Sequence, residues 1–298
     1  MELLRRYPGN PILKPNPLHP WEALNVFNAA IVHHRGLFHM LYRAQGLDYV
    51  SHIGYAVSED GFHWARLDRP VLSPATEFET RGVEDPRVTR IGDTFYMTYT
   101  GYSPHGTRAS LARSQNFITW ERMGVVLPGE NNKDHVLFPE KIGERYAMLH
   151  RRPPNIWLAY SHDLVHWTDH QIIMRPRRGT WEHWKIGAAG PPIKTEQGWL
   201  LIYHGVDAHG VYRLSAALLD LADPSVVLAR PAGFILEPQE TWEHRGDVPH
   251  VVFSCGAIVV NDELYVYYGG ADRVMAVATC SMAEMIAFVS EEQVATNA

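Results

Sequence analysis

Hydrophobic and polar residues alternate in short segments along this chain, which is the pattern of β-strands with one buried face. The alternation is clear in two stretches, FHMLYRA at 38–44 and YVYYGG at 265–270. One stretch near the C-terminus, AEMIAFVSEEQ at 283–293, has helical periodicity instead. The pattern predicts an all-β chain with a short helical tail from about residue 282.

Five segments of the chain share one arrangement, in which a turn leads into an apolar and aromatic strand, and a loop leads into a second strand. The ends of the first strands are separated by roughly 50 to 65 residues, about the size of a four-stranded propeller blade. These ends are Tyr42, Tyr99, His150, Tyr203 and Tyr268. Five repeats predict a five-bladed β-propeller with a central channel, as one domain over residues 1–298.

The first three repeats end in a tryptophan, and a turn carrying Asp or Asn comes just before it. The three residues are Trp64, Trp120 and Trp167. An aromatic residue after a hairpin turn is expected to pack between neighbouring blades. We therefore predict that these tryptophans are structural.

The composition is that of an ordinary globular protein, with 298 residues, 46% hydrophobic residues and 20% charged residues. The formal net charge is −6, and no basic run supports binding to nucleic acid. No apolar run approaches the ~20 residues of a membrane span, and the N-terminal residues do not resemble a signal peptide. We expect a cytoplasmic protein that binds neither nucleic acid nor a membrane.

Two cysteines, Cys255 and Cys280, are too few for a disulfide framework and lack zinc-ligand spacing. We expect buried thiols and no metal site.

A carboxylate stands in an unusual context between the first two repeats, in the segment Glu84-Asp85-Pro86-Arg87. Proline biases the residue before it towards an extended conformation, so the Asp85 carboxylate would be held in place. It is either a catalytic acid or a carboxylate that caps a turn before a strand, and this segment alone favours the turn.

Basic residues occur at the corresponding places in later repeats, at the ends of otherwise apolar strands. They are Lys133, Arg151, Arg152 and His204. These side chains converge if the propeller is right, and Arg and Lys supply several charge-assisted donors to phosphate. The pattern predicts an anion site near the central channel.

Several short motifs, in this order along the chain, resemble glycoside hydrolase family 130, which comprises mannoside phosphorylases and some mannosidases. The resemblance runs from Asn10 to about Cys280. Its motifs are EDPR, FPEKI followed by LHRRPP, AGPPIKT, IYHGVD, GDVPHVVFSCGAIV and YYGGAD. The resemblance implies the five-bladed propeller that the repeats predict independently.

The resemblance also implies roles for individual residues. Asp85 matches the proton donor, and a second group matches the phosphate-binding positions, namely Lys133, Arg151, His204 and, beside them, Tyr212. A third group would hold the mannosyl ring, namely Asn28, Arg43 and Asp272.

The implied reaction is a single displacement with inversion that cleaves a β-1,4- or β-1,2-mannoside with inorganic phosphate and releases α-mannose 1-phosphate. Phosphate is then a co-substrate, and no other cofactor is expected. In this family the acid acts through a sugar hydroxyl that relays its proton. Two alternatives remain, a β-mannoside hydrolase of the same propeller family and a non-catalytic sugar-binding propeller. The linkage, the acceptor, the chain length and the oligomeric state, a homo-oligomer included, stay open.

Overall fold

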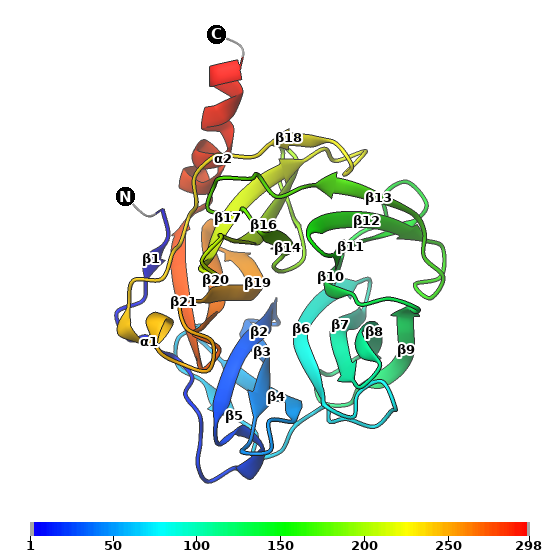
Figure 1. Ribbon diagram of the computed structural model, residues 1–298, viewed down its shortest axis with the longest axis vertical. Helices are drawn as coiled ribbons and strands as arrows, with labels where there is room; N and C mark the ends of the chain where they lie inside the picture. The colour runs from blue at the N-terminus through cyan, green and yellow to red at the C-terminus, as the bar shows by residue number, and fades with distance from the viewer. Residues whose placement is uncertain (1–2, 297–298) are drawn as a thin grey trace.

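The structure is a computed structural model that describes residues 3–296, and it is an all-β protein. Figure 1 shows the strands gathered into groups around a common centre. In chain order they are β1 (Arg5–Arg6), β2 (Asn25–His34), β3 (Leu37–Gln45), β4 (Ser51–Ser58), β5 (Ala65–Arg66), β6 (Gly82–Ile91), β7 (Thr94–Ser103), β8 (Gly106–Ser114), β9 (Glu121–Leu127), β10 (Lys133–Leu137), β11 (Tyr146–Arg152), β12 (Asn155–Ser161), β13 (Thr168–Met174), β14 (Lys185–Ala188), β15 (Ile193–Lys194), β16 (Trp199–Val206), β17 (Tyr212–Leu219), β18 (Val227–Ala229), β19 (Val252–Val260), β20 (Glu263–Gly270) and β21 (Val274–Ser281).

Helical structure is limited to three segments of the described chain. They are a 3₁₀ turn η1 (Pro20–Glu22), a four-residue helix α1 (Thr241–His244) and the C-terminal helix α2 (Met282–Thr296). The predicted helical stretch near the C-terminus is therefore confirmed. Helix α1 was not predicted, because four residues are too few to give a helical period.

The strands form antiparallel meanders in which neighbours in sequence pair with each other. Two meanders, β2-β3-β4 and β6-β7-β8-β9, are joined into one sheet by a single parallel bridge between Ser51 and Gly82. Three further sheets contain β10 to β13, β14 to β18, and β19 to β21 with β1. The N-terminal strand β1 thus pairs with β21 near the end of the chain, with Arg5 opposite Thr279.

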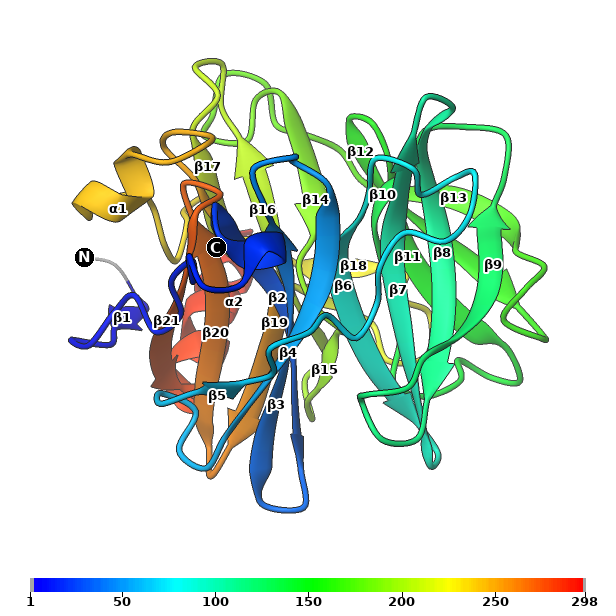
Figure 2. The ribbon, with the colours of Figure 1, turned by 90° about the horizontal axis from the view of Figure 1, so that it is seen from below.

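The strand pairs expected from the five repeats are all present as antiparallel hairpins. The pairs are β3 with β4, β7 with β8, β11 with β12, β16 with β17, and β20 with β21. Each hairpin follows a strand that lies nearer the centre, and these inner strands are β2, β6, β10, β14 and β19. In Figure 2 the long strands run from one face of the molecule to the other.

The aligned residues of the repeats share a buried polar contact as well as a position. In four repeats the tyrosine hydroxyl donates to a buried glutamate at 2.7 to 3.0 Å, in the pairs Tyr42–Glu22, Tyr99–Glu79, Tyr203–Glu182 and Tyr268–Glu243. An arginine also pairs with each glutamate. In the remaining repeat, Asn132 lies 2.9 Å from the ring of His150. A buried carboxylate needs such partners, so the contact ties each hairpin to the segment before its inner strand.

The hydrophobic core lies between neighbouring sheets. Trp120 and Trp167 are buried there, and Trp64 is partly buried against the same kind of cluster. Each cluster combines residues of two adjacent meanders, so the predicted structural role of the three tryptophans is confirmed. Cys255 and Cys280 are buried free thiols, as predicted.

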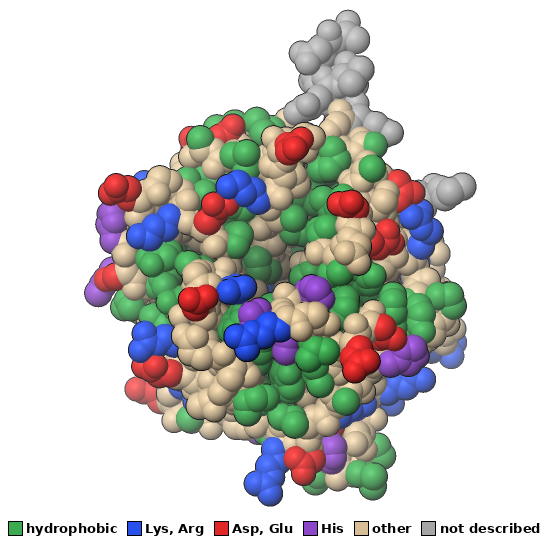
Figure 3. All heavy atoms as spheres, turned by 180° about the vertical axis from the view of Figure 1, so that it is seen from behind, with side chains coloured by type: hydrophobic (Ala, Val, Ile, Leu, Met, Phe, Trp, Pro, Cys, Tyr) green, Lys and Arg blue, Asp and Glu red, His purple; other side chains and the backbone are tan. Residues whose placement is uncertain are grey.

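The surface carries both signs of charge. On the face opposite to that of Figure 1, acidic and basic side chains are interspersed around a hollow near the middle (Figure 3). Among residues 3–296, no helix has the length and apolar character needed to span a bilayer.

Candidate active site

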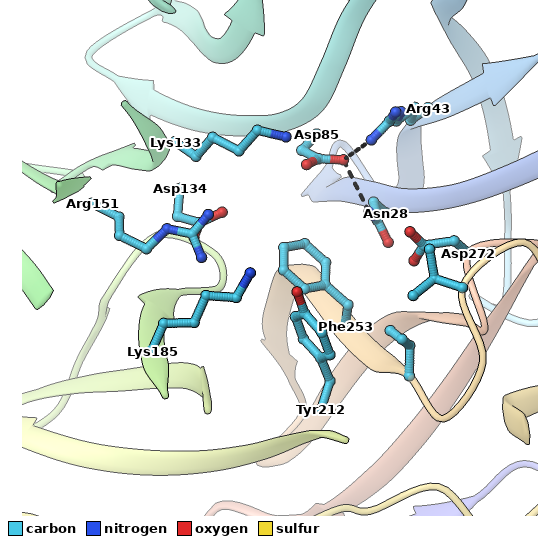
Figure 4. Close-up of a pocket in the computed structure, with 12 residues that line it drawn as sticks. Asn28, Arg43, Asp85, Lys133, Asp134, Arg151, Lys185, Tyr212, Phe253 and Asp272 are labelled. Carbon is cyan, nitrogen blue, oxygen red and sulfur yellow. Dashed lines mark hydrogen bonds and ion pairs between the residues drawn. The ribbon is translucent and has the colours of Figure 1, made fainter. Parts of the chain in front are cut away.

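The inner strands enclose a cavity of about 300 Å³ near the centre of the molecule. Most of its carboxylate and amide side chains lie at one end, together with Arg43, and most of its cations lie at the other end, together with Asp134 (Figure 4). We call these ends the carboxylate half and the cationic half. The first contains Asn28, Arg43, Asp85 and Asp272, and the second contains Lys133, Asp134, Arg151, Lys185 and Tyr212.

Three cavity residues occupy the same kind of backbone position on three successive inner strands. Asn28 in β2, Asp85 in β6 and Asp134 in β10 each lie at a shift of strand register and have φ values of 50°, 51° and 51°. The extended conformation expected for Asp85 before Pro86 is therefore wrong, because the bulge places this residue in the left-handed region instead. Asn and Asp tolerate this left-handed conformation better than other residues with a side chain. A β-bulge turns a side chain out of the regular alternation, and here it directs three polar groups into the centre.

The carboxylate half is organised around Asp85. Its Oδ1 accepts a hydrogen bond of 2.9 Å from Nδ2 of Asn28 and one of 3.1 Å from Nη1 of Arg43. Asp272 follows β20 in a turn with φ of 52°, and its carboxyl group faces the same space in Figure 4. One carboxylate is therefore anchored by two donors, and a second one faces the cavity beside it.

These two carboxyl groups differ in protonation. Burial alone would raise the pKa of Asp85, but the charges of Arg43, Lys133 and Arg87 outweigh it and hold this pKa below its usual range. Burial raises the pKa of Asp272 to about 7, and the charge of Asp85 adds to the effect. Asp85 is thus ionised, while Asp272 holds a proton part of the time near neutral pH.

The cationic half contains three positive side chains from three strands. Lys133 begins β10, Arg151 lies opposite it on β11, and Lys185 begins β14. Nε of Arg151 lies 2.9 Å from Oδ2 of Asp134, an ion pair whose angle is too bent for a hydrogen bond. Asp134 also accepts a 3.0 Å hydrogen bond from Arg87, a fully buried residue beneath the cavity. The half carries more positive than negative charge, as an anion site requires.

Lys185 is the cation with the most perturbed environment. Its Nζ lies 5.3 Å from the ring centre of Tyr212 and 5.4 Å from that of Trp184. Burial lowers the pKa of Lys185 to about 8, and the positive charge of Arg151 lowers it further. Burial also raises the pKa of Tyr212 to about 12, so its hydroxyl remains a neutral donor at the cavity wall.

His204 differs from its predicted role as a cation in the cavity. It lies on β16 with no exposed surface, and its ring packs at 4.6 Å from the ring of Phe253. Burial lowers the pKa of His204 to about 3, although Asp134 opposes the shift. Its Nε2 lies 3.6 Å from Oδ2 of Asp134. His204 is therefore a neutral residue behind the cavity wall.

Seven of the eight predicted site residues line one cavity, and they come from separate parts of the chain. They are Asn28, Arg43, Asp85, Lys133, Arg151, Tyr212 and Asp272. Of the basic residues predicted to form an anion site, Lys133 and Arg151 line this cavity. Arg152, the next residue on β11, pairs with Glu130 and stacks on Trp157, away from the cavity.

Sequence reasoning missed five of the lining residues, Asp134, Lys185, Val248, Val251 and Phe253. A signal existed for two of them. Lys185 begins its inner strand as Lys133 does, and Asp134 has the bulged position of Asn28 and Asp85. Phe253 belongs to an apolar run that looks like core in the sequence. Among residues 3–296, no cluster of three or more His, Cys, Asp or Glu side chains has the geometry to hold a metal ion.

Comparison with known proteins assigns this arrangement to a family. Residues 3–291 match the family model described as beta-1,4-mannooligosaccharide phosphorylase. The chain is 51% identical over 292 residues to 1,2-beta-oligomannan phosphorylase of Thermoanaerobacter sp. (strain X514), which covers 95% of this chain and 98% of that protein.

Solved structures agree with the sequence match. Beta-1,2-mannobiose phosphorylase of Listeria innocua, in complex with beta-1,2-mannobiose, superimposes with a TM-score of 0.90 and 32% identity over 96% of this chain and 99% of that one. A further solved structure has a TM-score of 0.87 and 27% identity over 94% of both chains. It is described under the statement that the GH130 family of mannoside phosphorylases contains glycoside hydrolases that target beta-1,2 mannosidic linkages in Candida mannan. The chain belongs to glycoside hydrolase family 130, the family of mannoside phosphorylases.

Proposed function

We propose that this chain is a β-1,2-mannoside phosphorylase that uses inorganic phosphate and releases α-mannose 1-phosphate with inversion. The observation that carries the proposal is the division of one cavity into a carboxylate half and a cationic half. The preference for the β-1,2 linkage is supported by the 51% identity to the oligomannan enzyme and by the fold shared with the mannobiose complex.

Each half of the cavity has a proposed task. Asn28, Arg43 and Asp272 hold the mannosyl ring beside Asp85, the proton donor. Lys133, Arg151, Lys185 and Tyr212 bind phosphate, and His204 supports them from behind through Asp134. Arginine and lysine supply charge-assisted donors to phosphate, and a tyrosine hydroxyl supplies a neutral one.

In the proposed reaction a phosphate oxygen attacks the anomeric carbon on the side opposite the glycosidic bond. The new carbon–oxygen bond forms as the glycosidic bond breaks, and the bonding electrons stay on the departing oxygen. That oxygen takes a proton which Asp85 supplies through a sugar hydroxyl. Such acid assistance typically contributes about 10²- to 10⁴-fold in rate. The cations hold the phosphate in place for attack, and the bound anion stabilises the positive charge that develops at the anomeric carbon in the transition state.

The cationic half argues against hydrolysis by the same cavity. An inverting hydrolase needs a second carboxylate, roughly 6.5 to 9.5 Å from the acid and on the opposite face of the sugar, to activate water. Asp272 stands beside Asp85 in the carboxylate half, where it is proposed to hold the mannosyl ring. The carboxylate of the cationic half is Asp134, which Arg87 and Arg151 both hold. Burial would raise its pKa, but these charges keep the pKa well below the usual range, so Asp134 is a weak base.

The five meanders are proposed to be the blades of one propeller domain around this cavity. Their inner strands all contribute to the centre, and β1 would close the last blade by pairing with β21. This arrangement explains why residues as far apart in sequence as Asn28 and Asp272 share a cavity.

The proposed function is tested by incubating the protein with β-1,2-mannobiose or β-1,4-mannobiose, with and without inorganic phosphate. We expect mannose 1-phosphate of the α configuration, detected by ³¹P and ¹H NMR, from the β-1,2 substrate in the presence of phosphate. Free mannose released at the same rate without phosphate would show a hydrolase. Binding of mannobiose without any cleavage would show a sugar-binding protein.

A further inference from the structure

Glu84 is a buried carboxylate at the boundary between the two halves of the cavity. Nη2 of Arg43 donates to its Oε1 at 2.9 Å, and Nζ of Lys133 donates to its Oε2 at 2.9 Å. The Glu84 side chain is only 6% exposed. One carboxylate thus bridges a cation of each half.

The backbone bulge in β6 makes this bridge possible. Consecutive residues of a regular strand point to opposite faces. The register shift between Glu84 and Arg87 removes this alternation, and Asp85 has a positive φ. As a result Glu84 and Asp85 both contact the guanidinium group of Arg43, at 2.9 and 3.1 Å. The side chains form a continuous series, from Lys133 through Glu84 and Arg43 to Asp85.

Lys133 is therefore not a free cation. Its ammonium group already has an anionic partner, and Glu84 raises the pKa of Lys133 against the opposing effect of burial. A phosphate that enters the cationic half must compete with Glu84 for this ammonium group. If phosphate takes Lys133, the Glu84 carboxylate keeps Arg43 as its remaining positive partner.

We propose that Glu84 is a positioning residue. It holds the Lys133 ammonium group until phosphate binds that group instead, and Glu84 then draws Arg43 away from Asp85. This inference rests on the proposed function. It adds a residue that links binding of phosphate to protonation of Asp85. With Arg43 and Lys133 beside it Asp85 is ionised, yet it must hold a proton when the glycosidic bond breaks. Loss of a positive neighbour favours the protonated form of a carboxyl group.

The titratable and charged groups near Asp85 come from several elements. They are Arg43 of β3, Glu84 and Arg87 of β6, Lys133 and His135 of β10, Tyr212 of β17, Cys255 of β19 and Asp272 after β20, and Asn28 of β2 adds a hydrogen bond. Of these, Glu84 alone contacts a cation of the cationic half and also a donor of Asp85. It is the residue through which a change at Lys133 reaches Asp85 by direct contacts.

The variant Glu84→Gln tests the inference, because the side chain keeps its shape and loses its charge. We expect it to bind inorganic phosphate about 10-fold more tightly in isothermal titration calorimetry, since a competing anion is removed. We also expect kcat with β-1,2-mannobiose to fall at least about 10-fold at pH 7. The alkaline limb of its pH profile should move to lower pH, because Arg43 stays on Asp85. A merely structural role would weaken both binding and turnover.

The matched control is Glu121→Gln, which removes an exposed carboxylate that pairs with Arg113 at 2.8 Å on β9. It should leave phosphate binding and turnover unchanged. If Glu84→Gln fails to fold in a thermal melt, Glu84→Asp keeps the charge on a shorter side chain that cannot span both cations, and the same slowed turnover is expected. Unchanged or weaker phosphate binding by Glu84→Gln, in a wild-type background that phosphorolyses mannobiose, overturns the inference alone. A wild-type protein that neither binds phosphate nor needs it overturns the proposed function.

Discussion

Nδ2 of Asn28 donates a 2.9 Å hydrogen bond to Oδ1 of Asp85, and both residues occupy bulged, left-handed positions on neighbouring inner strands. Asp134 has the same position on the next inner strand. The same bulged backbone conformation therefore places three groups at the cavity: an amide, the proposed acid, and the carboxylate that pairs with the cationic half. A site that catalyses a reaction needs groups held on rigid elements, and strands of a sheet provide them better than loops do.

Asp85→Asn tests the role of the proposed acid. The amide keeps the shape and the contact with Asn28 but carries no proton that can be transferred to the leaving group. We expect phosphorolysis of β-1,2-mannobiose to fall by about 10²- to 10⁴-fold, while mannobiose binding in calorimetry and the thermal midpoint change little. Asp93→Asn is the control, since Asp93 is exposed and pairs with Arg90 far from the cavity. Turnover close to that of the wild type would assign Asp85 to a structural role in its strand.

Gly187→Ala tests the packing behind the cationic half. A Cβ atom at position 187 would overlap Oδ2 of Asp134 and lie 2.5 Å from Cε1 of His204, closer than real contacts allow. We expect a loss of about 1 to 3 kcal/mol in the free energy of urea unfolding and a higher KM for phosphate, because Asp134 positions Arg151. Gly233→Ala is the control, since its nearest neighbour would be Phe288 at 3.8 Å. Equal stability of the two variants would contradict the rigid packing described for this wall.

The strand pairs and the order of the repeats were predictable from the sequence because alternation and turn residues are local signals. Tyr42 and Tyr268 are each the end of a recognisable apolar strand. The pairing of β1 with β21 was not predictable in this way, since two residues carry no period and their partner lies at the other end of the chain. The buried glutamates that bind the tyrosines follow an aromatic residue in each case, as in Trp21-Glu22, but a lone carboxylate reads as a surface residue.

The site was predicted in part for a related reason. Carboxylates and cations stand out in a strand sequence, so Asp85 and Arg151 were identified. Their partners depend on how the inner strands meet, and this is a property of the fold. His204 is neutral because it is buried. The surrounding sequence, LIYHGV, does not show whether the histidine lies on the cavity wall or behind it.

The pH dependence of phosphate binding should report Lys185. Its pKa is about 8, so the ammonium form prevails below pH 8 and is lost as the pH rises through that value. Phosphate is already mostly a dianion there, because its second pKa is about 6 to 7. We expect the KM for phosphate to rise as the pH increases from 8 to 9.5, with little change in the KM for mannobiose. Lys185→Arg should remove this rise, since arginine stays charged. A phosphate KM that is flat over this range would exclude Lys185 from the phosphate site.

Arg151 and Arg152 offer the sharpest comparison, because the two residues are adjacent on β11 and point in opposite directions. Arg151 lines the cavity beside Asp134, whereas Arg152 pairs with Glu130 on the outside. Removing one charge-assisted contact to phosphate costs about 1.5 to 3 kcal/mol, which is roughly 10- to 150-fold in affinity. We therefore expect Arg151→Ala to raise the KM for phosphate by at least about 10-fold and to change the KM for mannobiose much less.

Arg152→Ala removes the same charge from the same strand, so a general effect of charge would appear equally in both variants. We expect the phosphate KM of this variant to stay within about 2-fold of the wild type, because Arg152 does not line the cavity. Lys185→Ala combined with Arg151→Ala should give less than the sum of the two single effects in free energy, since groups that contact one anion are coupled. Additive effects, or equal effects of Arg151→Ala and Arg152→Ala, would mean that these cations do not share a phosphate. Steady-state kinetics with phosphate and β-1,2-mannobiose varied in turn distinguish these outcomes, because binding of the anion and of the sugar are then measured separately.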